Sequence, residues 1–201
     1  MRNMLRCFCV LLVVSLAGTA PQAQEATDKK AAPTAKKQEA ATETVAILHT
    51  SMGDITLGFH PDVAPNHVEN FLELSRSKFY DGTLFHRVIK GFMIQGGDPL
   101  SKDDNPGNDG TGNGPRKIKA EFGQLPHNRG AVSMARGGHP DSASCQFFIV
   151  HQDSNFLDGK YSVFGYVIDG MDVVDKIALT PTKGERPDQD VVIRSVEVSS
   201  R

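Results

Sequence analysis

Alternating apolar positions in residues 45–61 predict two β-strands joined by a short turn. Every second residue of each run falls on one face: Val45, Ile47 and His49 in the first run, and Ile55, Leu57 and Phe59 in the second. A period of two residues is typical of a strand with one buried face. The sequence Ser-Met-Gly-Asp at 51–54 separates the runs, so the segment is expected to form a β-hairpin.

Two later segments have the spacing of amphipathic helices instead. After Pro65, four residues recur at i, i+3, i+4 and i+7 and so share one stripe of a helix: Val68, Phe71, Leu72 and Ser75. Proline is tolerated in the first helical turn, because the N–H that it lacks would have no partner there. A second, shorter helix is expected in MDVVDKIAL at 171–179, directly after an Asp-Gly turn.

Short apolar runs separated by glycine-containing connections predict further strands. They lie at 83–89, 92–95, 130–135, 145–150, 162–168 and 191–198. The glycine-rich residues 96–115 are expected to form a long surface loop. Many short strands with only two helices favour an antiparallel barrel or sandwich over a repeating βαβ fold.

The first 44 residues differ in composition from the rest of the chain. Residues 1–23 combine a basic start, an apolar run and small residues, in the order of a secretory signal peptide. The apolar run is shorter than the ~20 residues that span a bilayer, so cleavage is expected, with an uncleaved membrane tether as the alternative. Residues 24–44 contain no aromatic residue and favour a flexible low-complexity tether. Residues 45–201 suffice for one domain with a hydrophobic core.

Charge and cysteine content exclude several classes of protein. The formal net charge is −2 with basic and acidic residues interleaved, so the chain has no nucleic-acid-binding footprint. Cys7 and Cys9 fall in the predicted signal peptide, which leaves Cys145 as the single cysteine of the mature chain and without a disulfide partner in it. Cys145 precedes an apolar run and is expected to be a small core residue rather than a nucleophile.

Familiar catalytic and metal-binding motifs are missing from the sequence. The glycine-rich loop lacks the GK[ST] of a phosphate-binding loop, and its acidic residues lack the glutamate that closes a calcium loop, so a solvated loop is expected. The histidines do not have the spacing of a zinc site. Ser133 lies outside any G-x-S-x-G motif, and the sequence positions no His–acid pair to serve it. Covalent hydrolysis is therefore poorly supported.

One stretch, FHRVIKGFMIQGGD at 85–98, combines a cation, apolar residues and an amide without any nucleophile. Taken alone, its apolar residues would be core and Arg87 would be a surface residue. Two other stretches, SMARGGHPDSASCQFFIV at 133–150 and NFLDGKYSVFG at 155–165, again contain small, amide and aromatic residues. Together they shift the interpretation toward a binding site.

These three blocks resemble the cyclophilin family of peptidyl-prolyl cis–trans isomerases, in the order and rough spacing of that family. The similarity runs from about residue 45 to the end of the sequence. It implies a mainly β fold, a closed eight-stranded antiparallel β-barrel capped by two α-helices, which agrees with the pattern of strands and helices. With its predicted signal peptide, the chain resembles exported bacterial members, so we expect a periplasmic protein, with secretion or membrane tethering as alternatives.

The resemblance also implies roles for single residues. Arg87 would be the catalytic arginine, and Gln95 and Gln146 would orient the peptide backbone. The remaining predicted site residues would line the proline pocket or the surface beside it: Phe92, Met93, Ala135, Arg136, Phe148, Phe156, Leu157 and Tyr161.

Three of these positions depart from the common family pattern. Arg136 stands where many members carry Asn, and Tyr161 stands where many carry His. Phe156 stands where cyclosporin-sensitive members carry Trp. Because Phe has no hydrogen-bond donor, cyclosporin binding is expected to be weak.

The implied reaction is rotation about X-Pro peptide bonds in unfolded or partly folded exported proteins. Rotation transfers no group, so no metal or other cofactor is expected. The alternative is a chaperone module of the same fold that binds proline-containing peptides with little turnover. The mature protein is expected to be a monomer with no nucleic-acid partner and no integral membrane span.

Overall fold

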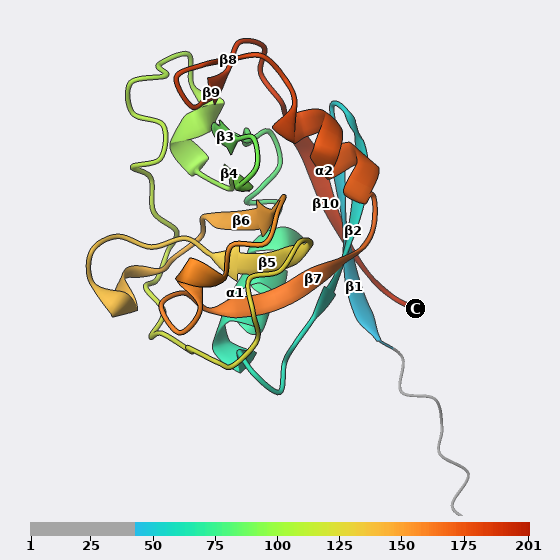
Figure 1. Ribbon diagram of the computed structural model, residues 1–201, viewed down its shortest axis with the longest axis vertical. Helices are drawn as coiled ribbons and strands as arrows, with labels where there is room; N and C mark the ends of the chain where they lie inside the picture. Colours follow the sequence, from blue (N-terminus) through green and yellow to red (C-terminus); the bar gives the residue numbers. More distant parts are fainter. Residues whose placement is uncertain (1–42) are drawn as a thin grey trace, which may run out of the picture. The chain divides into compact units, whose positions relative to one another are not determined.

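The computed structural model describes residues 43–201, which Figure 1 shows in colour. The predicted signal peptide and nearly all of the predicted tether lie outside these residues. Within the described part of the chain, no helix is long and apolar enough to cross a membrane.

The predicted hairpin is present at the start of the described region. β1 (Thr44–Thr50) and β2 (Gly53–Phe59) pair in antiparallel fashion, with Leu48 opposite Ile55, and both of these side chains are buried. β1 begins one residue earlier than predicted, because Thr44 pairs with Ser200 on the last strand.

Eight strands form one antiparallel sheet, as predicted, in the order β10–β1–β2–β7–β5–β6–β4–β3 (Figure 1). The strands after the first hairpin are β3 (Arg87–Ile89), β4 (Met93–Gly96), β5 (Ala131–Met134), β6 (Phe147–Val150), β7 (Val163–Asp169) and β10 (Ile193–Ser200). A separate two-stranded hairpin, which the sequence pattern did not predict, consists of β8 (Thr182–Lys183) and β9 (Arg186–Pro187).

The sheet is strongly curled, but it is not the fully closed barrel that was expected. The predicted strand at 83–89 is reduced to β3, and no continuous ladder joins β3 to β10 within residues 43–201. The gap is bridged by single hydrogen bonds, such as the one from Phe85 N to Val191 O at 2.9 Å, and by an isolated bridge between Leu84 and Val192. The sheet is therefore a half-barrel.

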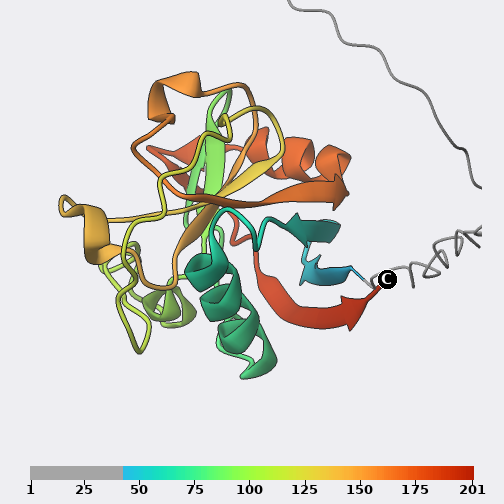
Figure 2. The same cartoon turned by 90° about the horizontal axis from the view of Figure 1, so that it is seen from below.

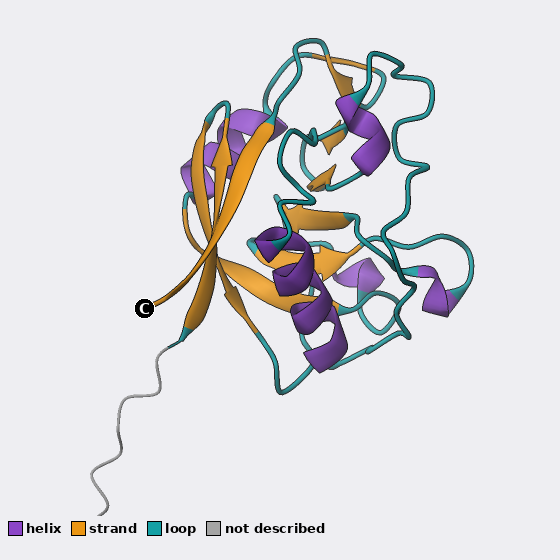
Figure 3. Ribbon diagram, turned by 180° about the vertical axis from the view of Figure 1, so that it is seen from behind, coloured by secondary structure: helices purple, strands orange, loops and turns teal. Residues whose placement is uncertain are grey.

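Two α-helices cover the curled sheet, as predicted. α1 (Pro65–Arg76) packs against β10 and β7, and the predicted stripe of Val68, Phe71, Leu72 and Ser75 is buried. α2 (Met171–Ala178) packs against β2, β3 and β4 and buries Val174 and Ile177. Figure 2 shows the two helices on opposite sides of the sheet, and Figure 3 shows α1 from behind, lying across the curled strands.

The start of α2 depends on one glycine. Gly170 has a φ of +88°, a backbone conformation that residues with a side chain rarely adopt. A Cβ at this position would also collide with the backbone of Asp54 in β2. The sharp turn from β7 into α2 therefore requires glycine, and it brings the helix directly onto the first hairpin.

The core is divided into two apolar clusters that share β6. Phe147 belongs to the main core and makes edge-on ring contacts with Phe71 and Tyr80. Its neighbour Phe148 belongs to a smaller cluster with Met93 and Leu157. Successive side chains of a strand point to opposite faces, so β6 contributes to the main core on one face and to the smaller cluster on the other. The smaller cluster forms the floor of the site described below.

The predicted long loop at 96–115 is partly ordered by its own side chains. A short 3-10 helix, η1 (Pro99–Lys102), begins within it, and Asp98 caps this helix by accepting a hydrogen bond from Leu100 N at 2.8 Å. Asp98 and Ser101 are buried. The expectation of a wholly solvated loop was therefore wrong for this part. Two other 3-10 helices, η2 (Pro140–Ser142) and η3 (Asn155–Leu157), lie in later connections.

Candidate active site

A row of four residues runs across adjacent strands of the sheet. Arg87 on β3 is opposite Gln95 on β4, Gln95 is opposite Phe148 on β6, and Phe148 is opposite Ser133 on β5. Directly opposite residues of an antiparallel pair point to the same face. The strand register therefore places a guanidinium, an amide and an aromatic ring side by side, although they are far apart in the sequence.

A cavity of about 300 Å³ opens on this face. Ten of the eleven predicted site residues line it: Arg87, Phe92, Met93, Gln95, Ala135, Arg136, Phe148, Phe156, Leu157 and Tyr161. Met93, Phe148 and Leu157 are buried and form an apolar floor, whereas Phe156 is 63% exposed. The cavity thus has an apolar base, and Arg87 and Gln95 add polar groups to its lining.

The eleventh predicted residue, Gln146, lies outside this cavity but is coupled to it. Gln95 donates a hydrogen bond from Nε2 to Oε1 of Gln146 at 3.0 Å. Gln146 in turn donates from Nε2 to the carbonyl oxygens of Gly110 and Gly112, at 3.0 and 2.9 Å. These bonds fix which end of each amide faces which neighbour and connect the glycine-rich loop to the site. Gln146 also lines a second cavity of about 300 Å³, which shares Gln95, Ala135 and Arg136 with the first.

Two pairs of aromatic rings contribute to the lining of the cavity. Phe148 and Tyr161 meet edge to face with ring centroids 5.8 Å apart, and Phe92 and Phe156 lie 5.3 Å apart. The guanidinium carbon of Arg136 lies 4.7 Å from the centre of the Tyr161 ring, and its Nε donates to Lys160 O at 3.0 Å. Cation–π contact and this hydrogen bond hold Arg136 against Tyr161, so two of the three residues that depart from the family pattern support each other.

A polar triad next to Phe148, in which His127 and Ser133 are buried, corrects one expectation from the sequence. His127 Nδ1 lies 2.8 Å from Asp158 Oδ1, and His127 Nε2 lies 3.1 Å from Ser133 Oγ. A His–acid pair therefore does reach Ser133, and it was missed because its members come from distant loops. Ser133 has no exposed surface, however, so it cannot attack a substrate. The His127 ring lies parallel to Phe148, with centroids 6.0 Å apart, so the triad supports the pocket floor from behind.

Burial determines the ionisation of His127 and Cys145. Burial lowers the pKa of His127, although the hydrogen bond and charge of Asp158 act in the opposite direction. A neutral ring with its Nδ1–H directed at Asp158 leaves Nε2 free to accept from the Ser133 hydroxyl. Burial also raises the pKa of the Cys145 thiol to about 11, so it is protonated at neutral pH. Cys145 is a buried core residue, as predicted, and not a nucleophile.

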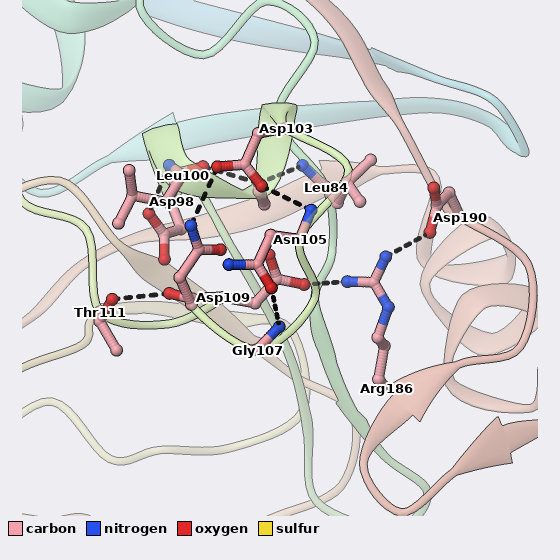
Figure 4. A network of polar contacts seen from close by, with 12 residues as sticks. Leu84, Asp98, Leu100, Asp103, Asn105, Gly107, Asp109, Thr111, Arg186 and Asp190 are labelled. Atoms are coloured by element: carbon pink, nitrogen blue, oxygen red, sulfur yellow. Dashed lines mark hydrogen bonds and ion pairs between the residues drawn. The ribbon is translucent and has the colours of Figure 1, made fainter.

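Asp98, Asp103 and Asp109 of the glycine-rich loop bind the loop itself and one arginine (Figure 4). Asp103 accepts hydrogen bonds from Asn105 N at 2.7 Å and from Asn108 Nδ2 at 2.9 Å. Asp109 forms an ion pair with Arg186, which also pairs with Asp190 at 2.7 Å. Among residues 43–201, no three His, Cys, Asp or Glu side chains are grouped so as to hold a metal ion.

Glu185 also contacts the site and was not predicted from the sequence. Glu185, at the turn of the β8–β9 hairpin, accepts a hydrogen bond from Arg87 Nε at 2.5 Å. Arg87 also donates from Nη1 to Oε1 of Gln95 at 3.3 Å. Nothing in the local sequence signals this contact, since Glu185 lies in a polar turn far from Arg87 along the chain.

The lining of the cavity limits the chemistry that it can perform. It offers a charged hydrogen-bond donor, an amide and an apolar floor. None of the ten lining residues is a serine, cysteine, lysine, histidine, aspartate or glutamate that could act as a nucleophile or general base. Such a site can bind an apolar ring and stabilise a change in shape or charge. Its one hydroxyl, the phenol of Tyr161, has the Arg136 guanidinium over its ring and no general base among the lining residues to activate it.

Comparisons with known proteins agree with this arrangement. The family model described as cyclophilin type peptidyl-prolyl cis-trans isomerase/CLD matches residues 44–198. The chain is 43% identical over 170 residues to peptidyl-prolyl cis-trans isomerase A of Dickeya dadantii, covering 80% of this chain and 85% of that protein. It is 47% identical over 141 residues to a probable peptidyl-prolyl cis-trans isomerase of Brucella abortus, covering 67% of this chain and 71% of that protein.

Solved structures show the same fold. A cyclophilin-type peptidyl-prolyl cis-trans isomerase of Cryptosporidium parvum, crystallised in the presence of the dipeptide Ala-Pro, superposes with a TM-score of 0.72 and is 32% identical. The match covers 78% of this chain and 99% of that one. Taken with the matched family model and the arrangement of the cavity, these similarities show that the chain belongs to the cyclophilin-type peptidyl-prolyl cis–trans isomerases.

Proposed function

We propose that this protein accelerates the folding of exported polypeptides by rotating X-Pro peptide bonds, with Arg87 stabilising the twisted amide and the apolar cavity holding the proline ring. The observation that carries the proposal is that Arg87 and the buried apolar residues Met93, Phe148 and Leu157 line the same cavity, which has no serine, cysteine, lysine, histidine or acidic residue in its lining. A reaction that breaks no covalent bond requires only such binding and electrostatic groups.

The transition-state stabilisation that this proposed function requires is moderate. Rotation about an X-Pro bond crosses a barrier of about 18–20 kcal/mol, because C–N conjugation must be broken. The uncatalysed event takes ~10–100 s. Shortening it to about 10 ms requires roughly four decades, or about 5.5 kcal/mol of transition-state stabilisation.

Arg87 can supply part of this stabilisation selectively. In the twisted amide, the proline nitrogen regains its lone pair and becomes a hydrogen-bond acceptor. A guanidinium directed at this nitrogen binds the twisted state more strongly than either planar state, which is the condition for catalysis. A charge-assisted hydrogen bond contributes about 1.5–3 kcal/mol.

Pre-organisation of the cavity supplies the remaining transition-state stabilisation. Met93, Phe148 and Leu157 hold the ring in place, so that rotation occurs on the carbonyl side of the bond. The linked amides of Gln95 and Gln146 have fixed orientations and contact the substrate backbone without first having to reorganise.

The test is two-dimensional NMR exchange spectroscopy on a short Ala-Pro-Phe peptide, with wild-type protein and Arg87→Ala compared at equal concentration. Wild type is expected to produce exchange cross-peaks between cis and trans peptide, and Arg87→Ala is expected to lose them while still binding the peptide. Binding without exchange by both proteins would contradict the proposal and favour a chaperone module that grips proline-containing segments.

The proposed substrates are exported proteins, because residues 1–23 have the composition of a signal peptide. We propose a periplasmic location and a cleaved leader. Cell fractionation and mass measurement of the protein test this, with Leu12→Arg, which interrupts the apolar run, as control. A mature protein without residues 1–23 in the periplasm supports the proposal. Full-length protein in the membrane fraction would favour the tether instead, and full-length protein in the cytoplasm would refute export.

A further inference from the structure

The side of Arg87 opposite Gln95 is occupied by Glu185. The Arg87 Nε–H donates to Glu185 Oε2 at 2.5 Å, while Nη1 donates to Gln95 Oε1 at 3.3 Å. The guanidinium is therefore held at two points by acceptors from two different elements, β4 and the turn of the β8–β9 hairpin. Both side chains are only partly covered, Arg87 being 38% and Glu185 54% exposed.

The β8–β9 hairpin is anchored so that Glu185 stays in this place. The carbonyl oxygen of Glu185 accepts a hydrogen bond from Val88 N at 2.6 Å, next to Arg87 in β3. The following residue, Arg186, is tied to the glycine-rich loop through Asp109 and to its own segment through Asp190 (Figure 4). Gly184 makes the turn possible with a φ of +68°. The backbone bond from Val88 and the ion pairs of Arg186 thus hold the segment that contains Glu185 in place.

A free arginine side chain samples many rotamers, and only some of them direct its terminal nitrogens into the cavity. The hydrogen bond from Nε to Glu185 restricts rotation about the last bonds of the Arg87 side chain. The two side-chain hydrogen bonds of Arg87 use Nε and Nη1, so neither of them occupies Nη2. Because catalysis depends on a hydrogen bond formed only at the twisted state, the orientation of the guanidinium before that state is reached affects the rate.

We propose that Glu185 is a positioning residue that holds Arg87 in its catalytic orientation. This inference rests on the proposed function, since it assigns Arg87 the stabilising role. The role of Glu185 is to fix the guanidinium through Nε and not to contact the peptide. Loss of the acceptor should therefore lower kcat and leave KM nearly unchanged, because the apolar floor that binds the proline ring is not altered.

The experiment compares Glu185→Ala and Glu185→Gln with wild type, using kcat and KM for a proline-containing peptide. Glu185→Ala is expected to lower kcat by about three- to fivefold. A factor of this size corresponds to the free energy that a partly exposed ion pair contributes to holding Arg87 in one orientation. Glu185→Gln keeps an acceptor oxygen at the same distance from the backbone and should retain most of the rate. The matched control is Glu73→Ala, because Glu73 also pairs with an arginine, Arg116, at 2.8 Å and similar exposure, but neither residue lines the cavity. This control should leave both constants unchanged.

A spectroscopic readout separates positioning from a general structural effect. The Nε–H signal of Arg87, assigned by its absence in Arg87→Ala, should exchange slowly with water in wild type. It should exchange faster in Glu185→Ala and at an intermediate rate in Glu185→Gln. In the Arg87→Ala background, Glu185→Ala should have no further effect on kcat, since the group that it positions is gone.

The outcomes distinguish failure of this inference from failure of the proposed function. If Arg87→Ala abolishes exchange but Glu185→Ala has wild-type kcat, Glu185 does not position Arg87 and only this inference is overturned. An increase in kcat in Glu185→Ala would also overturn it, because the carboxylate would then be restraining Arg87 away from its working orientation. If Arg87→Ala itself retains the wild-type rate, the proposed function fails first.

Discussion

Arg87 and Gln95 are directly opposite each other on adjacent antiparallel strands, and their side chains meet with 3.3 Å between Nη1 and Oε1. The strand register, and not a flexible loop, brings the cation to the amide. Residues on regular strands are held more firmly than residues on loops, so the spacing of the two groups is built into the sheet.

The first prediction concerns Arg87. Arg87→Ala should lower kcat/KM by about two decades, or about 2.7 kcal/mol, because it removes a hydrogen bond made only at the twisted state. Arg87→Lys should also be strongly impaired, since an ammonium group cannot contact Gln95 and Glu185 in the manner of a planar fork. Peptide isomerisation assays measure the rate, and thermal unfolding checks that the fold is kept. A near-wild-type rate for Arg87→Ala would refute the assigned role.

The second prediction uses two neighbours on β6. Phe148→Leu should raise KM for a proline-containing peptide, because Phe148 forms part of the cavity floor. Phe147→Leu should instead lower the free energy of unfolding by about 1–3 kcal/mol, since Phe147 lies in the main core, and should leave KM unchanged. Denaturant unfolding and peptide titration measure both quantities for both variants. Equal effects of the two substitutions on KM would show that the faces of β6 do not have separate roles.

The third prediction concerns the amide network. Gln146→Ala removes the donor to the carbonyls of Gly110 and Gly112 and the acceptor for Gln95. We expect kcat/KM to fall by about tenfold, because Gln95 and the loop lose their fixed orientation. Faster amide hydrogen exchange in residues 107–114 should accompany this fall. Gln124→Ala, at an exposed position away from both cavities, is the control and should change neither measurement.

The fourth prediction is a pH dependence of stability due to His86. His86 is buried, and its ring nitrogens have no hydrogen-bond partner. Burial lowers its pKa below the ordinary value of 6.5, although the charge of Asp98 acts in the opposite direction. The unfolded chain therefore binds a proton near pH 6.5, whereas the folded protein binds it only at lower pH. The free energy of unfolding should accordingly fall as the pH drops below 6.5.

His86→Leu tests this contribution directly. The substitution removes the titrating group and should reduce the slope of stability against pH by up to about 1.4 kcal/mol per pH unit. Replacing unpartnered polar atoms with an apolar group should cost little stability at pH 8. Urea unfolding at pH 8, 7, 6 and 5 measures the slope. An unchanged slope would mean that other buried histidines, such as His67 and His127, account for the pH dependence instead.

The fifth prediction concerns cyclosporin. Phe156 is 63% exposed at the edge of the cavity and has no hydrogen-bond donor. We expect weak binding by wild type and binding at least about tenfold tighter by Phe156→Trp, since an indole N–H supplies the missing donor. Titration calorimetry measures both affinities, and isomerase activity on a short peptide should be similar in the two proteins. Tight binding by wild type would contradict this expectation.

The parts of the fold with a clear local period were predicted well. The buried stripe of α1 and the buried face of β2, with Ile55, Leu57 and Phe59, follow directly from spacings of 3.6 and 2 residues, and the structure confirms both. In β1 the alternation is present, but the fully buried residues are Ala46 and Leu48, whereas Ile47 and His49 are only partly buried. The strand predicted at 83–89 was too long, because the same apolar residues can be buried in an irregular segment as well as in a ladder. For the same reason, closure of the barrel could not be judged from the pattern.

The site was predicted from its three sequence blocks, and the structure places ten of the eleven named residues around one cavity. Contacts that depend on tertiary structure were not predictable. His127 and Asp158 are polar residues of separate loops, and Glu185 lies in a hairpin with only two residues in each strand. Neither periodicity nor a local motif marks such residues, because their partners are set by how distant segments fold together.

The pairing of β1 with β10 has a consequence for synthesis of the protein. Thr44 at the start of β1 pairs with Ser200 at the end of β10, and the backbones of Glu43 and Arg201 exchange hydrogen bonds of 3.1 and 2.9 Å. During synthesis on the ribosome, one edge of β1 therefore stays unpaired until the residues between β1 and β10 have been translated. Contacts between such distant positions form slowly, and the unpaired edge of β1 can form hydrogen bonds with other chains. This domain thus completes its own folding only after β10 has been synthesised.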